Sequence, residues 1–227
     1  MQSEHIAEYY IVMSEPKKVT PFFLYLLILA MPAGPANGEH PLGPNEERGS
    51  TARQHRVLPP AVTEQQEYYD LCGCCEKDLQ CEMTEKAIRW KDGKKYDSVT
   101  SWKVKWDYAY NRSSHACFAD NFRVTMNVVF RLPRWTCPEP VSQALVDKWT
   151  PYITNLVEHE NGHRDLALTA AHDLTRAVAE MPPARTCSDL DAAVDAMSRE
   201  WMKKLDEDQA LFDAHTGHGF AQGVMFP

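Results

Sequence analysis

The sequence predicts an α+β fold in which an N-terminal antiparallel sheet packs on a long helix, followed by a second helix. Two patterns predict it. Apolar side chains alternate with polar ones between residues 99 and 131, and they recur every three or four positions between residues 145 and 212. Because the strand-like segments precede the helix-like segments instead of alternating with them, the sheet and the helices are expected to form separate blocks.

The sheet is predicted from two alternating segments, residues 99–110 and 122–131. The polar segment 111–121 between them is predicted to be the loop of an antiparallel hairpin. Residues 86–96, with a turn at Asp92-Gly93, are expected to supply a further strand and turn. The apolar face of the hairpin comprises Trp102, Val104, Trp106, Tyr108 and Tyr110 from the first strand, and Phe122, Val124, Met126, Val128 and Phe130 from the second.

A long amphipathic helix is predicted from Leu145 onward, where apolar residues begin to recur with the helical repeat. Pro182-Pro183 ends it, because proline cannot continue a helix. Thr150-Pro151 also fits an N-cap followed by a proline in the first turn, in which case the main helix begins there. The start of this helix therefore has two alternatives.

A second helix is predicted to begin at Ser188, with Asp191 three residues further on as a weaker form of a capping box. Residues 213–227 are rich in glycine and histidine and show no period. The apolar stripe of the second helix comprises Leu190, Val194, Met197, Trp201, Leu205 and Phe212.

Residues 1–36 are predicted to be a secretory signal peptide. Two lysines precede a short apolar run, residues 21–33, and small residues follow it. The run is shorter than the roughly 20 apolar residues that span a bilayer. We expect the signal to end at Ala36, with Ala33 as the alternative, and translation to start at Met13. An uncleaved N-terminal membrane anchor is the alternative to a signal peptide.

The rest of the chain divides by composition. Residues 37–62 are rich in proline, glycine and charge without any period, and are predicted to be a linker or flexible arm. Residues 63–219 are predicted to form one folded domain, and residues 220–227 a tail. After signal removal we expect no stable membrane span. The protein is therefore predicted to be secreted or periplasmic.

The overall charge excludes one class of partner. The 227 residues carry a formal net charge of −8 at pH 7. General nucleic-acid binders need clustered lysine and arginine to contact phosphates, so no nucleic-acid partner is expected.

The segment that indicates chemistry is His159-Glu160-Asn161-Gly162-His163, an HExxH motif inside the long predicted helix. Helical residues four apart lie about 40° apart around the axis, so both imidazoles project from one face and can bind one Zn²⁺. The glutamate between them can then act as general base toward a water on that metal. Without a metal, a histidine pair on a buried helix face would need a hydrogen-bond partner for each of its ring nitrogens, because burying an unpaired polar group is costly. The sequence therefore predicts a zinc site.

A catalytic zinc ion needs a third protein ligand and an open position. Leu166 and Thr169 stand where HExxHxxGxxH would need glycine and histidine, so that arrangement is excluded. The remaining candidates lie in residues 212–219, which are predicted to be a loop after the second helix. His218 is preferred because glycines on both sides give its backbone freedom to approach a metal. A frayed, histidine-containing tail is the alternative.

Further motifs join the HExxH between Thr100 and Gly219, about half of the chain, and together they resemble a known family. The motifs are Thr100-x-Trp102 with Trp106 and Tyr108, Cys117, Leu132-Pro133-x-Trp135, Leu145 and Trp149, His159-Glu160-x-Gly162-His163, Cys187 and Asp213-x-x-Thr216-x-His218-Gly219. In this combination the chain resembles the bacterial domain-of-unknown-function family described as predicted secreted zinc-dependent proteases.

The resemblance implies an exported metalloprotease-like domain. It implies that His159, His163 and His218 are the zinc ligands and that Glu160 is catalytic.

The chain departs from the family pattern at one position. The closing motif of the family usually begins with tyrosine, and this chain has Phe212 there. If that hydroxyl stabilises the oxyanion, another group must replace it here. Asp213, His215 and Thr216 are the candidates for stabilising the oxyanion or for orienting a metal ligand.

The cysteines are expected to form disulfides, because thiolates seldom persist in an oxidising compartment. Cys117 and Cys187 are a candidate pair that would tie the sheet to the second helix, with Cys137 as an alternative partner. Seven cysteines leave one thiol unpaired or paired between chains. The remaining four form a cluster near the start of the domain, with partners that cannot be assigned: Cys72, Cys74, Cys75 and Cys81.

From these features we expect an α+β, zincin-like domain that hydrolyses an amide bond in a peptide or protein substrate, with zinc as cofactor and Glu160 as general base. Cell-wall peptides are an alternative substrate that the sequence does not separate from proteins. A zinc-stabilised envelope protein that binds or supports without turnover is the alternative function.

Overall fold

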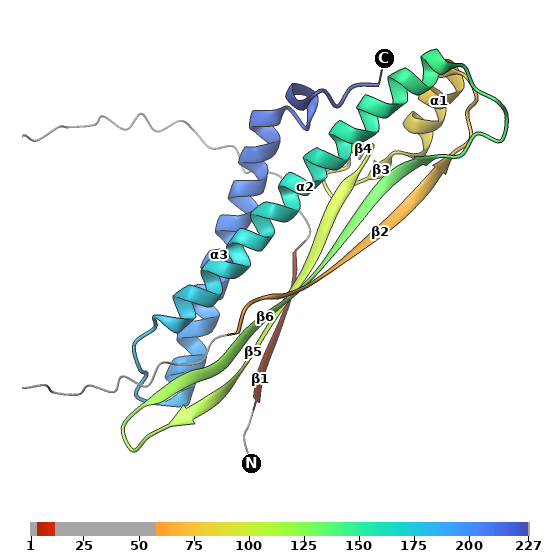
Figure 1. The fold of residues 1–227 in the computed structure, drawn as a ribbon. Coiled ribbons are helices and arrows are strands. Elements are labelled where there is room, and N and C mark those ends of the chain that lie inside the picture. The colour runs from red at the N-terminus through yellow and green to blue at the C-terminus, as the bar shows by residue number, and fades with distance from the viewer. Residues whose placement is uncertain (1–3, 12–57, 227) are drawn as a thin grey trace, which may run out of the picture. The chain divides into compact units, whose positions relative to one another are not determined.

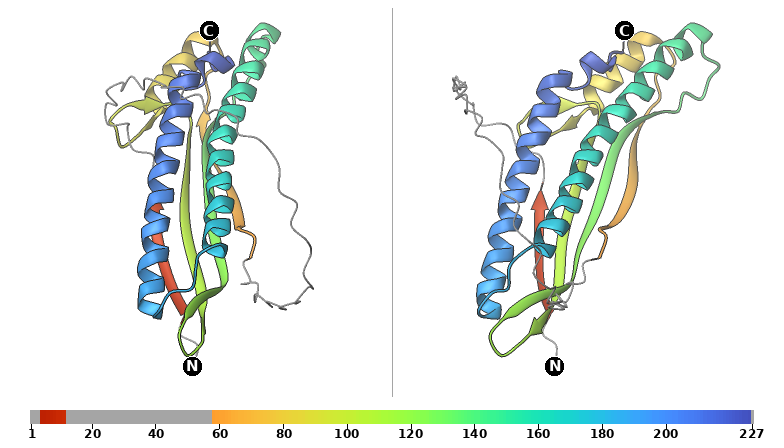
Figure 2. Two further views of the ribbon diagram at one scale, coloured as in Figure 1. Left: turned by 90° about the vertical axis from the view of Figure 1, so that its left-hand side faces the viewer. Right: turned by 60° about the vertical axis from the view of Figure 1, so that its left-hand side comes forward.

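The computed structural model describes residues 4–11 and 58–226. In these residues a four-stranded sheet carries two long helices on one of its faces (Figure 1), and the turned views in Figure 2 show both helices on that same face. The predicted α+β class is confirmed. The elements in chain order are β1 (Glu4–Ile11), β2 (Ala61–Leu71), α1 (Glu76–Lys86), β3 (Ile88–Arg89), β4 (Lys95–Tyr96), β5 (Val99–Arg112), β6 (Cys117–Trp135), α2 (Gln143–Ala179), α3 (Cys187–Thr216) and the 3-10 turn η1 (Phe220–Gln222).

The predicted hairpin is present as β5 and β6, which pair antiparallel with Trp106 opposite Val124. Its loop is shorter than predicted, because pairing continues to Arg112 opposite Cys117. Backbone hydrogen bonds extend the ladder through polar residues, which an apolar alternation cannot reveal. The predicted strand and turn at residues 86–96 are also present, as the two-stranded β3–β4 hairpin.

A fully antiparallel sheet, however, was the wrong prediction. The strand order is β1-β5-β6-β2, and β2 runs parallel to β6 while β1 and β5 pair antiparallel. Most β2 side chains are exposed, and only Leu71 at its end is buried. An edge strand of this kind carries no apolar alternation, so the sequence gives no local signal for it.

The long helix α2 begins at Gln143, and the Ser142 hydroxyl caps it by accepting from the Leu145 backbone N–H at 3.3 Å. The alternative start at Thr150-Pro151 is wrong, because Pro151 lies inside the helix. Thr150 is no cap there. Its hydroxyl instead donates to the Val146 carbonyl at 2.9 Å. The predicted end is confirmed, since α2 stops at Ala179 shortly before the two prolines.

The helix α3 is longer than predicted at both ends. Its N-cap is Thr186, not Ser188, and the Thr186 hydroxyl accepts from the Asp189 backbone N–H at 3.1 Å. It continues to Thr216, so the first part of the predicted loop 212–219 is helical. The αL residue that ends it is Gly217, with φ of 59°, which is the conformation that glycine adopts at little cost. This extension fixes the side chain of Asp213 on a helix.

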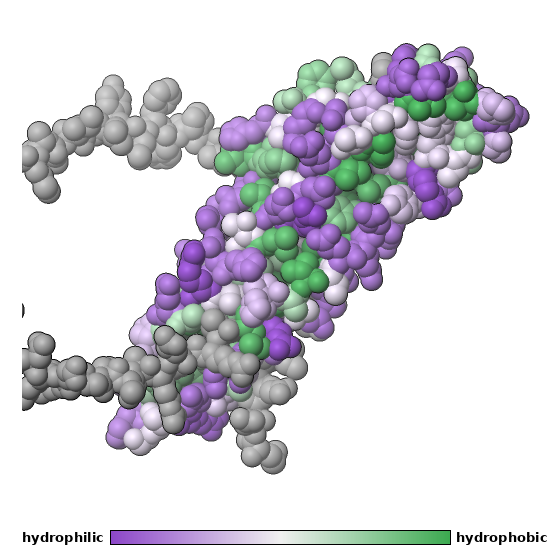
Figure 3. All heavy atoms as spheres, in the orientation of Figure 1, coloured by the Kyte–Doolittle hydropathy of each residue, from purple (hydrophilic) through white to green (hydrophobic). Residues whose placement is uncertain are grey.

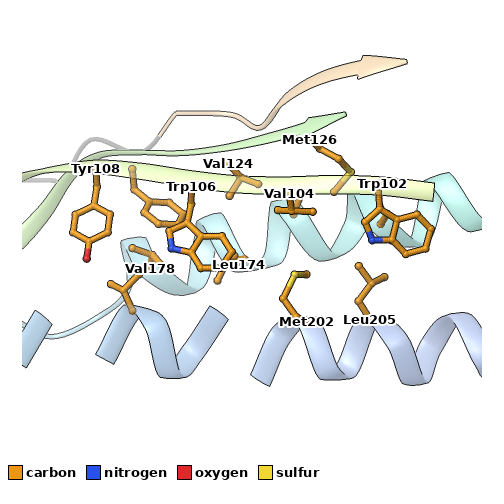
Figure 4. Close-up of a cluster of buried hydrophobic side chains, with 14 of the residues drawn as sticks. Trp102, Val104, Trp106, Tyr108, Val124, Met126, Leu174, Val178, Met202 and Leu205 are labelled. Carbon is orange, nitrogen blue, oxygen red and sulfur yellow. The ribbon is translucent and has the colours of Figure 1, made fainter. Parts of the chain in front are cut away.

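The main core lies between the helix-facing side of the sheet and the two long helices. Figure 4 shows Trp102 and Trp106 of β5 projecting from the sheet toward Leu174, Met202 and Leu205 of the helices. The alternating residues of β5 and β6 therefore bury the face that the sequence predicts, apart from Tyr110, which is half-buried. A second cluster packs α1 against the first half of α2: Leu71, Leu79, Met83, Leu145, Trp149, Tyr152 and Leu156.

Two disulfides are present. Cys117 is bonded to Cys187, the pair that the sequence favours, and ties the β5–β6 hairpin to the start of α3. Cys137, the alternative partner, is bonded to Cys74 instead. The expectation of one unpaired thiol is wrong, because three exposed thiols remain: Cys72, Cys75 and Cys81.

Much of the N-terminal region lies outside the described residues. This holds for the apolar run 21–33, for both expected signal ends and for nearly all of the predicted linker. Glu4–Ile11 falls within the predicted signal peptide, and its backbone pairs with β5 as β1. Ala61 and Val62, assigned to the linker, begin β2.

No helix among the described residues has both the length and the apolar character that a membrane crossing requires. The face seen in Figure 3 is mostly hydrophilic and carries separate hydrophobic patches along its length.

Candidate metal centre

The two histidines of the HExxH segment lie on the buried face of α2, four residues apart. His159 is 4% exposed and His163 is 1% exposed. Their Nε2 atoms approach each other to 3.3 Å, so both rings turn the same nitrogen toward one point. One helical turn brings them together, as the sequence predicts.

Asp213, from the last part of α3, completes this group. Its Oδ1 lies 3.1 Å from His163 Nε2 and 3.4 Å from His159 Nε2. Zinc bonds to nitrogen and oxygen are about 2.0–2.2 Å long, and a tetrahedron with such bonds has edges of roughly 3.3 Å. The three donor atoms therefore have the separations that one tetrahedral zinc ion requires. His159, His163 and Asp213 form the group of potential metal-binding side chains within the described residues.

The second nitrogen of each ring is held by a glutamine. His163 Nδ1 contacts Gln209 Oε1 of α3, and His159 Nδ1 lies 2.8 Å from Gln222 Oε1 of η1. An amide oxygen only accepts hydrogen bonds, so each Nδ1 carries a proton, and Nε2 is the nitrogen of each ring that is left for a metal. Histidines that bind metals are oriented in this way by a partner on the other ring nitrogen.

The electrostatics of the group follow from its burial. Burial by itself raises the pKa of Asp213, but hydrogen bonds from His159 and His163 and the nearby charge of His218 hold that pKa well below its usual range. Burial lowers the pKa of His163, yet Asp213 and the charge of Glu160 outweigh this and raise it. Without a metal, a positive charge is thus favoured where these side chains meet.

Glu160 is 3% exposed, and two hydroxyl groups, one just before β5 and one in its first residues, hold its carboxylate. Ser98 donates to Oε1 and Thr100 donates to Oε2. These two hydrogen bonds offset the cost of burying the carboxylate.

Phe212 is packed among the same side chains. Its ring stacks on His159 with a centroid distance of 5.1 Å and meets His163 edge-on at 4.9 Å. A Cβ on Gly162 would lie 2.4 Å from the para carbon of this ring, so only glycine fits there. The para position therefore lies against α2. This placement explains the glycine of the HExGH segment and gives Phe212 a packing role against both rings.

A cavity of about 440 Å³ opens beside the group. Its walls come from the β3–β4 hairpin, the start of β5 and the facing sides of α2 and α3. Asp97, at the rim of β5, accepts a hydrogen bond from the Tyr152 hydroxyl at 2.9 Å, and burial raises its pKa against that hydrogen bond. His159, Glu160, His163 and Asp213 all line this cavity.

The remaining predicted residues lie around the group. His218 is half-exposed, has a left-handed backbone with φ of 53°, and places Nδ1 3.5 Å from Asp213 Oδ1. The Thr216 hydroxyl accepts from the Gly219 backbone N–H at 3.3 Å and so shapes the turn that carries His218. His215 is exposed.

The sequence does not indicate the roles that several residues have in this site. The sequence indicates Asp213 only as an orienting or oxyanion group, because it predicts that the second helix ends before this residue. The sequence gives no signal for Gln209, Gln222 and Ser98, and it places Thr100 in a family-like motif without indicating its partner. Each of these residues is joined to its partner only by the packing of distant segments.

The fold and this site define a mixed α+β protein in which two buried histidines and a partly buried aspartate meet beside a cavity. The chain belongs to the family of bacterial proteins of unknown function DUF922, whose model matches residues 66–219. No curated protein and no solved structure matches the chain.

Proposed function

We propose that this protein is an exported zinc-dependent metallopeptidase with a zincin-like site on α2. The observation that carries the proposal is the convergence of His159 Nε2, His163 Nε2 and Asp213 Oδ1 at separations of 3.1–3.4 Å beside a cavity. Two imidazoles and one carboxylate are a donor set typical of catalytic zinc. In both imidazoles the amide oxygen at Nδ1 leaves Nε2 as the nitrogen that a metal would bind.

Each residue has a role in this proposal. His159, His163 and Asp213 hold the ion, and His218 is a candidate for a further ligand because it lies next to Asp213. Bound zinc lowers the pKa of a coordinated water to about 7 and polarises a carbonyl group. Glu160 takes the proton from the attacking water and delivers it to the leaving amine.

Hydrogen bonding also supports Glu160 as the general base. Ser98 and Thr100 fix its carboxylate in the wall of the cavity. A substrate carbonyl would have to lie inside this cavity, next to that carboxylate. Fixing a base in this way removes the cost of orienting it during the reaction.

The proposal is tested first by metal content. Purified wild-type protein is expected to carry one zinc per chain, and His159→Ala and Asp213→Ala to carry almost none. Glu160→Gln is expected to keep zinc and to lose hydrolysis of peptides, because glutamine cannot accept the proton. Wild-type protein without stoichiometric zinc contradicts the proposal, and so does full activity in Glu160→Gln. Parallel assays on unfolded proteins and on cell-wall peptides separate the two substrate classes.

The alternative is a zinc-stabilised envelope protein that binds or supports without turnover. The position of His218 favours it, because a fourth protein ligand would close the position that water needs. In that case His218→Ala weakens zinc binding strongly, and no substrate is turned over by the wild type. If His218 is not a ligand, His218→Ala keeps its zinc.

A further inference from the structure

The C-terminal segment Gly219–Phe226 lies, apart from Gly219 itself, beyond the residues that the family model matches, and it reaches the metal centre. Its Gln222 provides the oxygen at 2.8 Å from His159 Nδ1. The sequence shows no period here and predicts a tail. In the structure the segment forms the turn η1 and then returns along α2.

Several contacts fix this segment on α2. The Val224 backbone N–H donates to the Gly219 carbonyl at 3.0 Å, which closes the turn. Asn155 of α2 donates through its side chain to the Gly223 carbonyl at 3.1 Å. Phe226 packs edge-on against Tyr152 with ring centroids 5.5 Å apart.

The backbone of the turn also touches the histidine directly. Gly219 is buried and has φ of 84°, and a Cβ there would lie 2.6 Å from Val224 Cγ2 and 3.2 Å from His159 Cγ. Only glycine allows the turn to lie so close to the imidazole. His159 is thus enclosed by Phe212 on one face of its ring and by this segment at its Cγ and Nδ1.

The other histidine is held by a different kind of element. Gln209 is 2% exposed within α3, contacts His163 Nδ1 and also donates to the His163 backbone carbonyl at 2.9 Å. Two packed helices therefore set the orientation of His163. The orientation of His159 instead depends on a short C-terminal turn.

We propose that Gln222 is a positioning residue for the metal centre, through which the docked segment Gly219–Phe226 fixes the tautomer and direction of His159. This inference rests on the proposed metal site. Gln222 acts through His159 and touches neither metal nor substrate. The consequence is that metal affinity depends on how the last residues of the chain are seated.

The test compares zinc affinity in three single variants of the full chain, measured by competition with a chromophoric chelator. Gln222→Ala is expected to weaken zinc binding by about 10- to 100-fold, the usual effect of removing the partner of a metal-binding histidine. Gln222→Glu keeps an acceptor oxygen and is expected to regain most of the affinity. Met225→Ala is the matched control, because this side chain is 59% exposed in the same segment.

A purely structural role is excluded by a second readout. The unfolding midpoint of the metal-free protein is expected to be the same in wild type and Gln222→Ala. The visible spectrum of the cobalt-substituted protein is expected to change in Gln222→Ala and to stay as in wild type in the control Met225→Ala. Phe226→Ala, which loosens the segment without touching His159, is expected to weaken zinc binding as well.

Unchanged zinc affinity in Gln222→Ala overturns the inference and leaves the metal site standing. Equal losses in Gln222→Ala and Gln222→Glu also overturn it. If wild-type protein binds no zinc, the proposed function fails, and the inference fails with it.

Discussion

The helices α2 and α3 contact the sheet in two different ways along their length. Near their connection, Leu174 and Val178 of α2 and Val194 of α3 pack with Trp106 of β5 in an apolar core. Further along, the same two helices bury His159, Glu160 and His163 of α2 with Gln209 of α3. The disulfide Cys117–Cys187 lies at the apolar end.

The difference shows which part of the helix pair is explained by packing energy and which part is not. An apolar contact contributes roughly in proportion to the area it buries. A buried polar group contributes little or nothing even when every hydrogen bond is made, because its hydration is lost. A helix pair selected only for packing would not bury two imidazoles and a carboxylate. The polar end is therefore the part of the molecule that stability alone does not explain.

The largest expected effect tests the apolar end. Trp106 is completely buried, so Trp106→Ala is expected to lower the free energy of unfolding by about 3–5 kcal/mol through lost contacts and a cavity. Denaturant unfolding measures this. Trp201→Ala, on a half-buried residue of α3, is the control and is expected to cost less. A loss in Trp106→Ala no greater than in the control contradicts the assignment of the apolar core to this end.

The next effect is the stabilisation of the folded protein by zinc, which tests the polar end of the helix pair. Zinc at 100 times its dissociation constant is expected to stabilise wild-type protein by about 2.7 kcal/mol, because it binds the folded state. Asp213→Ala is expected to show almost none of this gain, since the third donor atom is removed. Thermal unfolding with and without zinc measures both. An equal gain in stability on adding zinc to wild type and to Asp213→Ala would show that the ion does not bind at Asp213.

A smaller effect on stability concerns the hydrogen bonds that allow the Glu160 carboxylate to be buried at the polar end. Thr100 is completely buried and donates to this carboxylate. Thr100→Val keeps the shape of the side chain but leaves a buried carboxylate oxygen without its donor, which costs about 1–3 kcal/mol. Thr100→Ser restores a hydroxyl and is expected to recover part of the loss. Denaturant unfolding of the metal-free proteins measures the series, and equal stability of Thr100→Val and wild type would show that the hydrogen bond has no net value.

The smallest effect is a pH dependence at the rim of the cavity. The pKa of Asp97 in the folded protein is raised by burial, so the folded state binds this proton more tightly than the unfolded chain does. Its contribution to stability is therefore present at low pH and is lost as the pH rises from the ordinary value of 3.8 through the raised one.

Asp97→Asn removes this loss and still accepts the hydrogen bond from Tyr152. Its free energy of unfolding is expected to gain on that of the wild type as the pH is raised through this window. Parallel curves for the two proteins across the window would show that Asp97 ionises as readily in the folded protein as in the unfolded chain.

Much of the fold was predictable because its signals are local. The alternation in β5 and β6 and the helical repeat in α2 and α3 record which side of each element faces the core. The histidine pair was predictable for the same reason, because one turn of helix alone brings residues 159 and 163 together. No such pattern in the sequence predicts the exposed strand β2 or the extension of α3 to Thr216.

The sequence by itself determined the α+β class, the hairpin, the long helix and the shared face of His159 and His163, because backbone periodicity fixes these within one element. Only the tertiary structure decided that Asp213 faces both histidines and that Gln209 and Gln222 hold their outer nitrogens. Those contacts join segments some 46–63 residues apart along the chain. Such contacts depend on how α3 and the C-terminal turn pack on α2, and this packing is set by the whole core.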